Sequence, residues 1–70
     1  MEHINYFHAG HLMSEAYEIT GIDFTYEEEH RKKFYNLTKQ EARELLHVMR
    51  VRPHILKDYI FKNIINDKPF

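Results

Sequence analysis

Apolar residues recur along most of the chain at intervals of three and four, the spacing of one buried helix face. The first such stripe consists of Ala9, Leu12, Met13, Ala16, Ile19 and Thr20. It predicts a helix over residues 4–20. Gly21 follows directly, and glycine readily takes the left-handed backbone that ends helices. Gly10 lies inside this helix, where it costs roughly 1 kcal/mol relative to alanine and permits either a close helix approach or a kink.

Two capping-box patterns mark further helix starts. Thr25 followed by Glu28 predicts a helix over residues 26–35, with acids in its first turn and bases later, an order that suits the helix dipole. Thr38 followed by Glu41 predicts the start of a third helix. The apolar stripe of this third helix is Ala42, Leu45, Leu46 and Met49.

Pro53 separates the third helix from a fourth. The residue before a proline avoids helical geometry, so we expect a break near residues 51–52 and a new helix over residues 53–66. This helix carries apolar residues on two sides, with Phe61 and Ile65 apart from the main stripe. It lies either at the centre of a bundle or in an oligomer interface, and the shortness of the chain favours the interface. The predicted fold is all-α, four short helices in a small bundle, followed by a tail over residues 66–70.

Charge divides the single 70-residue domain into an acidic hairpin over residues 1–35 and a basic hairpin over residues 36–70. Residues 1–30 hold seven acids and no Lys or Arg, whereas residues 31–70 hold ten bases and four acids. Such asymmetry indicates nucleic-acid contact on the basic side or a partner of opposite charge. The alternative is that the two halves pack together and their charges partly cancel.

Composition narrows the class of protein. The chain has no cysteine, which fits a reducing compartment, and no apolar run approaches the roughly 20 residues of a membrane span. With no secretion signal in its first residues, a cytoplasmic location is expected. Ser14 is the only serine and no Gly-rich phosphate loop exists, so we expect no enzyme and no cofactor.

Histidine and aromatic residues offer further candidate sites. His8, His11 and Glu15 share one side of the first helix, but zinc needs three or four ligands and a supporting shell. We therefore expect a solvated edge and no metal. Residues 1–30 also contain five aromatic residues, Tyr6, Phe7, Tyr17, Phe24 and Tyr26. Stacking on nucleic acid needs a basic surface, so a role in the core or in a protein interface is expected for them.

Residues 37–48 read L-T-K-Q-E-A-R-E-L-L-H-V. This pattern resembles the first helix of the helix-turn-helix in the excisionase and MerR-like families. The resemblance implies that a recognition helix begins near Arg52, enters the major groove and buries Leu56. His47, Met49 and Pro53 depart from the family pattern, and a plain helical hairpin is the alternative.

Basic residues flank the predicted break. A helix N-terminus attracts phosphate, and arginine reads guanine edges. The predicted DNA-binding residues are Arg43, Arg50, Arg52, His54 and Lys57. The first functional hypothesis is therefore a small, non-enzymatic regulator, of the kind mobile elements carry, that binds double-stranded DNA.

A second resemblance concerns residues 12–22, which are similar to the dimerisation hairpin of Sin-type repressors and antirepressors. It implies pairing of two chains through apolar helix faces, so we expect a homo-oligomer or a protein partner. The predicted interface residues are Leu12, Tyr17, Phe61 and Ile65. The alternative functional hypothesis is an antagonist or adaptor that binds and inhibits a host protein through its acidic, aromatic-rich first half.

Overall fold

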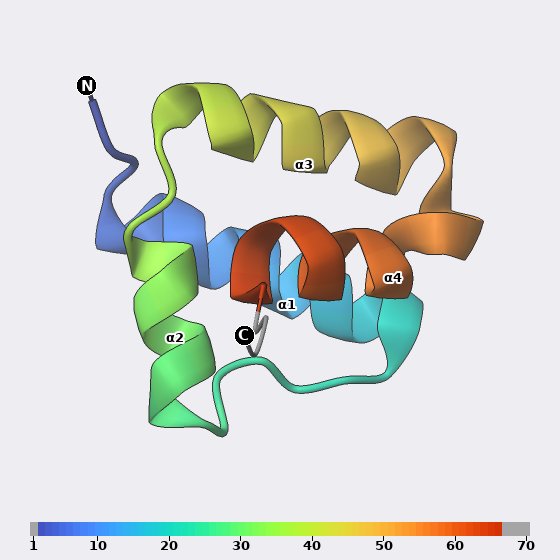
Figure 1. The fold of residues 1–70 in the computed structure, drawn as a ribbon, viewed down its shortest axis with the longest axis horizontal. Helices are drawn as coiled ribbons and strands as arrows, with labels where there is room; N and C mark the ends of the chain where they lie inside the picture. Colours follow the sequence, from blue (N-terminus) through green and yellow to red (C-terminus); the bar gives the residue numbers. More distant parts are fainter. Residues whose placement is uncertain (1, 67–70) are drawn as a thin grey trace.

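Four helices surround one core in the computed structural model, which describes residues 2–66 (Figure 1). Their bounds are α1, Tyr6–Thr20; α2, Glu28–Tyr35; α3, Lys39–Val51; and α4, Leu56–Ile60. A short turn, η1 (Pro53–Ile55), precedes α4, and a wider one, η2 (Phe61–Ile65), follows it. The all-α class is confirmed, because 75% of the described chain is helical. Residues 67–70 of the predicted tail lie outside the described residues.

The first helix begins two residues later than predicted because the segment before it pairs with the start of α3. Ile4 N–H donates to the Leu37 carbonyl at 3.1 Å, and Lys39 N–H donates to the Glu2 carbonyl at 3.0 Å. Asn5 then caps α1, its side chain accepting from the third helical N–H at 2.8 Å. Residues 2–5 therefore tie the beginnings of α1 and α3 together.

Gly21 ends α1 as predicted. Its φ of 79° is left-handed, and its N–H donates to the Tyr17 carbonyl at 2.8 Å. The loop that follows passes below the molecule to α2 and carries Phe24 into the core (Figure 1).

The capping box predicted at Thr25 is absent, and α2 begins at Glu28 without a side-chain cap. The Thr25 hydroxyl and N–H both donate to the Asp23 carboxylate instead. These two hydrogen bonds occupy the Thr25 hydroxyl and N–H, the groups that a capping box at the start of α2 would use. The acidic first turn and basic last turn of α2 are present as predicted, with Glu28 and Lys32 at 3.6 Å.

The second capping box, at the start of α3, is confirmed. The Thr38 hydroxyl accepts from Glu41 N–H at 3.1 Å, and the Glu41 carboxylate accepts from Thr38 N–H at 2.9 Å. Two of the N–H groups that a helix start leaves without partners are satisfied in this way.

Replacing Thr38 by alanine should therefore lower the free energy of unfolding by about 1 kcal/mol, the usual value for a lost cap. In a domain of this size that corresponds to a thermal midpoint about 4–8 °C lower, measurable by circular dichroism. Thr25→Ala is the matched control, since Thr25 caps no helix, and its effect should stay within about 0.5 kcal/mol. An equal loss of unfolding free energy in the two variants would contradict the assignment of Thr38 as the cap of α3.

The chain bends after α3, and α4 returns beneath it (Figure 1). The bend lies at Arg52, whose φ of −136° and ψ of 59° leave the helix, as expected before Pro53. The predicted helix over residues 53–66 forms as three pieces, η1, α4 and η2. In the last of them Asn66 N–H reaches back to the Phe61 carbonyl at 2.7 Å, which widens the closing turn.

One core joins both halves of the chain. Every helix contributes buried side chains, and the fully buried large ones are Phe24, Phe34, Leu45, Leu56, Ile60 and Ile65. The last helix lies in the centre of the bundle, because Leu56, Ile60 and Ile65 are buried where α4 and η2 pack on α1, α2 and α3, so no oligomer interface is needed to cover them. Its central position resolves the alternative that the sequence left open.

The acidic and basic halves also meet through charge. Glu2 pairs with Lys39 at 3.1 Å and Glu15 with Arg50 at 3.6 Å. Three of the four side chains are more than half exposed and Glu15 is 39% exposed, so each pair contributes at most about 1 kcal/mol. Within residues 2–66, no helix is long and apolar enough to cross a membrane.

Candidate interaction surfaces

Large aromatic side chains are exposed on α1 outside its buried stripe. We name this surface the α1 outer face and define it by Tyr6, Phe7, Gly10, Ser14 and Tyr17. The exposed fractions of its three aromatic residues are 75%, 80% and 53% in chain order. Exposed aromatic side chains that gather on one surface mark it as a candidate interaction site.

Two shallow hollows share Gly10 and Ser14 at the middle of the α1 outer face. One, of about 320 Å³, extends to Tyr6 and Phe7, and the other, of about 390 Å³, extends to Tyr17 and the loop after α1. Apart from the two chain neighbours and the nearby backbone of α1 itself, no atom lies within 4 Å of the point where a Cβ on Gly10 would stand. The two small residues therefore leave a gap between aromatic side chains, into which a partner's side chains could fit.

This open space makes Gly10→Ala a clean test of helix energetics. The methyl group meets nothing, and alanine is favoured over glycine inside a helix by about 0.8–1.0 kcal/mol. The free energy of unfolding, measured by urea titration, should rise by that amount. A loss of stability would show that the backbone at Gly10 is not helical.

The border of the α1 outer face carries two carboxylates and one guanidinium. Glu18 is exposed on α1, and Asp23 lines the hollow next to Tyr17. The Thr25 hydroxyl, and then the Thr25 N–H, hold the pKa of the Asp23 carboxyl below its usual value by donating to the charged form. Arg31 is the nearest Lys or Arg in the sequence, and its guanidinium donates to the Thr25 carbonyl at 2.7 Å.

Four of the five predicted DNA-binding residues lie where α3 turns into α4. We call this surface the α3–α4 corner, and its residues Arg50, Arg52, His54 and Lys57 are all exposed. Arg50 is paired with Glu15, whereas Arg52 and Lys57 form no ion pair within residues 2–66. In Figure 1 the corner lies at the opposite end of the molecule from the start of α2 and its glutamates.

The fifth predicted residue, Arg43, lies apart from this corner. It precedes Arg50 by two turns of α3, a separation of about 10 Å along the helix. Its guanidinium donates to Gln40 at 3.4 Å. Beside it, a hollow of about 500 Å³ reaches Tyr59, whose pKa is raised by burial and then by the charges of Glu44 and Glu41.

Two of the four predicted interface residues are placed wrongly. Leu12 and Ile65 are each only 2% exposed, because α4 packs on α1 and η2 packs on α2 in the centre of the bundle. Tyr17 belongs to the α1 outer face. Phe61 is 38% exposed, and its ring packs on the buried Phe24 at 5.7 Å between centroids.

The three candidate metal ligands of the first helix have separate surroundings. Glu15 pairs with Arg50, the ring of His11 stacks on Phe7 at 6.4 Å, and His8 lines a hollow between α1 and α3. Within residues 2–66, no three His, Asp or Glu side chains cluster closely enough to hold a metal ion.

The α1 outer face as one surface was missing from the sequence-based predictions. The signal for this surface is a second row of residues beside the buried stripe, since residues 6, 10 and 17 follow helical spacing among themselves. Comparison of the chain with protein-family models, with curated proteins and with solved structures finds no match.

Proposed function

We propose that this protein is a small, non-enzymatic binding module that captures a basic partner protein on the α1 outer face. It would act as an antagonist or adaptor. The observation that carries the proposal is the exposure of three aromatic residues around a gap at Gly10 and Ser14. Aromatic residues are enriched in the energetic centres of protein interfaces.

Burial of the exposed aromatic side chains by a partner would be favourable in free energy. Transfer of a Phe-sized side chain from water into an interface contributes about 1.5–3 kcal/mol. Tyr6, Phe7 and Tyr17 together offer several such contributions from a rigid helix, which limits the ordering cost of binding. A helix from the partner could approach α1 closely above Gly10, as small residues permit.

Charge selects the kind of partner. The first 30 residues contain no Lys or Arg, and Glu18 and Asp23 border the α1 outer face. A basic partner would be attracted and oriented by these carboxylates. A second copy of the chain would instead bring two acidic surfaces together, so we favour a different protein.

The test uses an amphipathic helical peptide with leucines on one side, lysines on the other and one tryptophan. Because the protein contains no tryptophan, the fluorescence of the peptide reports its binding alone. A peptide with glutamates in place of the lysines is the control. The proposal expects micromolar binding of the basic peptide and at least tenfold weaker binding of the acidic one. Equal affinity for both, or dimerisation of the protein through α1, would overturn it.

DNA binding through the α3–α4 corner is the second candidate. It is favoured by the exposure of Arg52, His54 and Lys57 at a sharp bend, far from the glutamates of α2. It ranks second because α4 has only five residues and buries Leu56 and Ile60, which leaves little helix to enter a groove.

If the corner binds DNA, Arg52→Ala should weaken binding to a random duplex by about tenfold, through the loss of a phosphate or base contact. The affinity of the unmodified protein should also fall steeply as salt rises. A mobility-shift titration at 50 and 150 mM salt measures both effects. Arg31→Ala, on α2 away from the corner, is the control and should stay within twofold. Absence of binding at 50 mM salt would eliminate this candidate.

A further inference from the structure

We propose that a hollow between α1 and α3 is a binding site for a small phosphomonoester. We call it the α1–α3 hollow; its volume is about 270 Å³, and its lining residues are Ile4, Asn5, His8, Lys39, Ala42, Arg43 and Leu46. This phosphomonoester proposal does not rest on the proposed function. His8 lies on the edge of α1 that borders α3, away from the α1 outer face.

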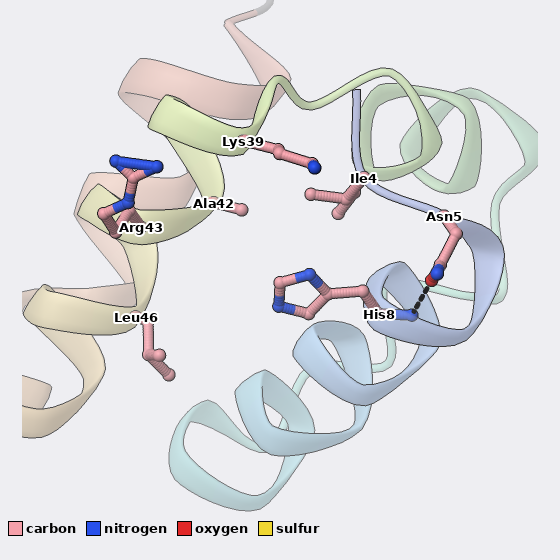
Figure 2. Close-up of a pocket in the computed structure, with 7 residues that line it drawn as sticks. All are labelled: Ile4, Asn5, His8, Lys39, Ala42, Arg43 and Leu46. Carbon is pink, nitrogen blue, oxygen red and sulfur yellow. Dashed lines mark hydrogen bonds between the residues drawn. The ribbon is translucent and has the colours of Figure 1, made fainter. Parts of the chain in front are cut away.

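The polar groups of the α1–α3 hollow come from two helices. Figure 2 shows the ring of His8 and the side chain of Lys39 reaching into the same space from α1 and α3. Arg43 stands at the rim, with its guanidinium turned toward Gln40. That contact is exposed and 3.4 Å long, so turning the arginine away from Gln40 and toward a ligand breaks only a weak hydrogen bond.

Charge in the α1–α3 hollow favours a dianion. The lining contains two permanent cations and a histidine, and it contains no carboxylate. Arginine and lysine are the usual partners of phosphate oxygens, and each bond to a charged group is stronger than a neutral one. Two cations in one small space match the two charges of a phosphomonoester better than the single charge of a carboxylate.

The floor of the α1–α3 hollow is apolar. Ile4 and Ala42 are buried, and Leu46 is half-buried at the edge of the core. A ligand that carries a small apolar group next to its phosphate could therefore contact both the cations and the floor. Inorganic phosphate would use only the first of these contacts.

The chain itself already places an anion beside this site. The Glu2 carboxylate lies 3.1 Å from Lys39 Nζ, with exposed side-chain fractions of 76% and 58%. An exposed pair of this kind is weak and can be displaced. Glu2 thus acts as an internal competitor that lowers the affinity of the α1–α3 hollow for an external anion.

The experiment titrates ¹⁵N-labelled protein with phenyl phosphate at pH 7.5, where the phosphate is a dianion because its second pKa is about 6. Benzoate is the matched monoanion. We expect saturable shifts centred on the amides of residues 5–8 and 39–43, with a millimolar Kd. Benzoate should bind at least fivefold more weakly. Equal binding of benzoate, or shifts spread over all basic surfaces, would overturn the proposal.

Three variants locate the site. Arg43→Gln should raise the Kd for phenyl phosphate at least fivefold, and Lys62→Gln, an exposed cation on η2, should change it less than twofold. Glu2→Gln should lower the Kd about threefold by removing the competitor. All three positions are exposed, so the folded state is retained. Equal effects of Arg43→Gln and Lys62→Gln, or no gain from Glu2→Gln, would contradict the assignment.

A fourth arm separates a free phosphomonoester from a nucleic-acid backbone. A 12-base-pair duplex is titrated at the same total phosphate concentration. The proposal expects the duplex to leave the amides of residues 5–8 unshifted. Tighter binding of the duplex to these residues would assign the α1–α3 hollow to DNA phosphates instead. The peptide assay for the α1 outer face is unaffected by Arg43→Gln, so failure of one proposal is distinguishable from failure of the other.

Discussion

Replacing Phe24 by alanine is expected to lower the free energy of unfolding by about 3–5 kcal/mol, the usual loss for a buried phenylalanine. Phe24 is fully buried, and its ring contacts Phe34 at 5.5 Å and Phe61 at 5.7 Å between centroids. It connects the loop after α1 to α2 and η2. Because small domains have only about 5 kcal/mol of stability to lose, a large part of the population should be unfolded at 37 °C.

Urea titration followed by circular dichroism measures this loss. Tyr26→Ala is the matched control, because Tyr26 belongs to the same loop but is 82% exposed. Its effect should stay within about 0.5 kcal/mol. If both variants lose the same stability, the loop is held by its backbone and the aromatic cluster around Phe24 is not the centre of the core.

Replacing Phe7 and Tyr17 together by serine should weaken binding of the basic helical peptide by at least about 100-fold. These residues stand on both sides of the Gly10–Ser14 gap and are exposed by 80% and 53%. Their removal takes away the apolar contact but leaves the two carboxylates at the border. Residual binding should then be electrostatic and should disappear at 300 mM salt, where such attraction is screened. Fluorescence of the peptide tryptophan measures both quantities.

Val51→Ser is the control for that double variant. Val51 is 58% exposed at the end of α3, apart from the α1 outer face, so the peptide affinity should not change. The thermal midpoint of the double variant should also stay close to that of the unmodified protein, since neither aromatic residue is part of the core. An unchanged affinity in the double variant would contradict the proposed binding face.

Local sequence signals predicted much of the fold because they act within a few residues. Gly21 ends α1, Thr38 caps α3 and Pro53 separates α3 from α4, as expected. Thr25 shows the limit of such signals. Like Thr38, it has a glutamate three residues later. The hydroxyl and N–H of Thr25 nevertheless donate to Asp23, an acceptor only two residues earlier in the sequence.

The packing partners of each helix could not be predicted in the same way. Helical spacing showed that the last helix has two apolar sides, but not that α1, α2 and α3 would cover both. Leu12 and Ile65 were therefore assigned to a surface although they lie inside the core. The α1–α3 hollow was equally hidden, because His8 and Lys39 are 31 positions apart in the sequence.

The segment before α1 has one more consequence. Its backbone hydrogen bonds, from Ile4 to Leu37 and from Lys39 to Glu2, hold the first turns of two helices at a single anchor. Local opening of this anchor would release α1 and α3 in concert, so amides near both helix starts should exchange with solvent at matching rates. A bulky fusion placed ahead of Glu2 would strain the same anchor, and its disturbance would reach the middle of the chain as well as the beginning.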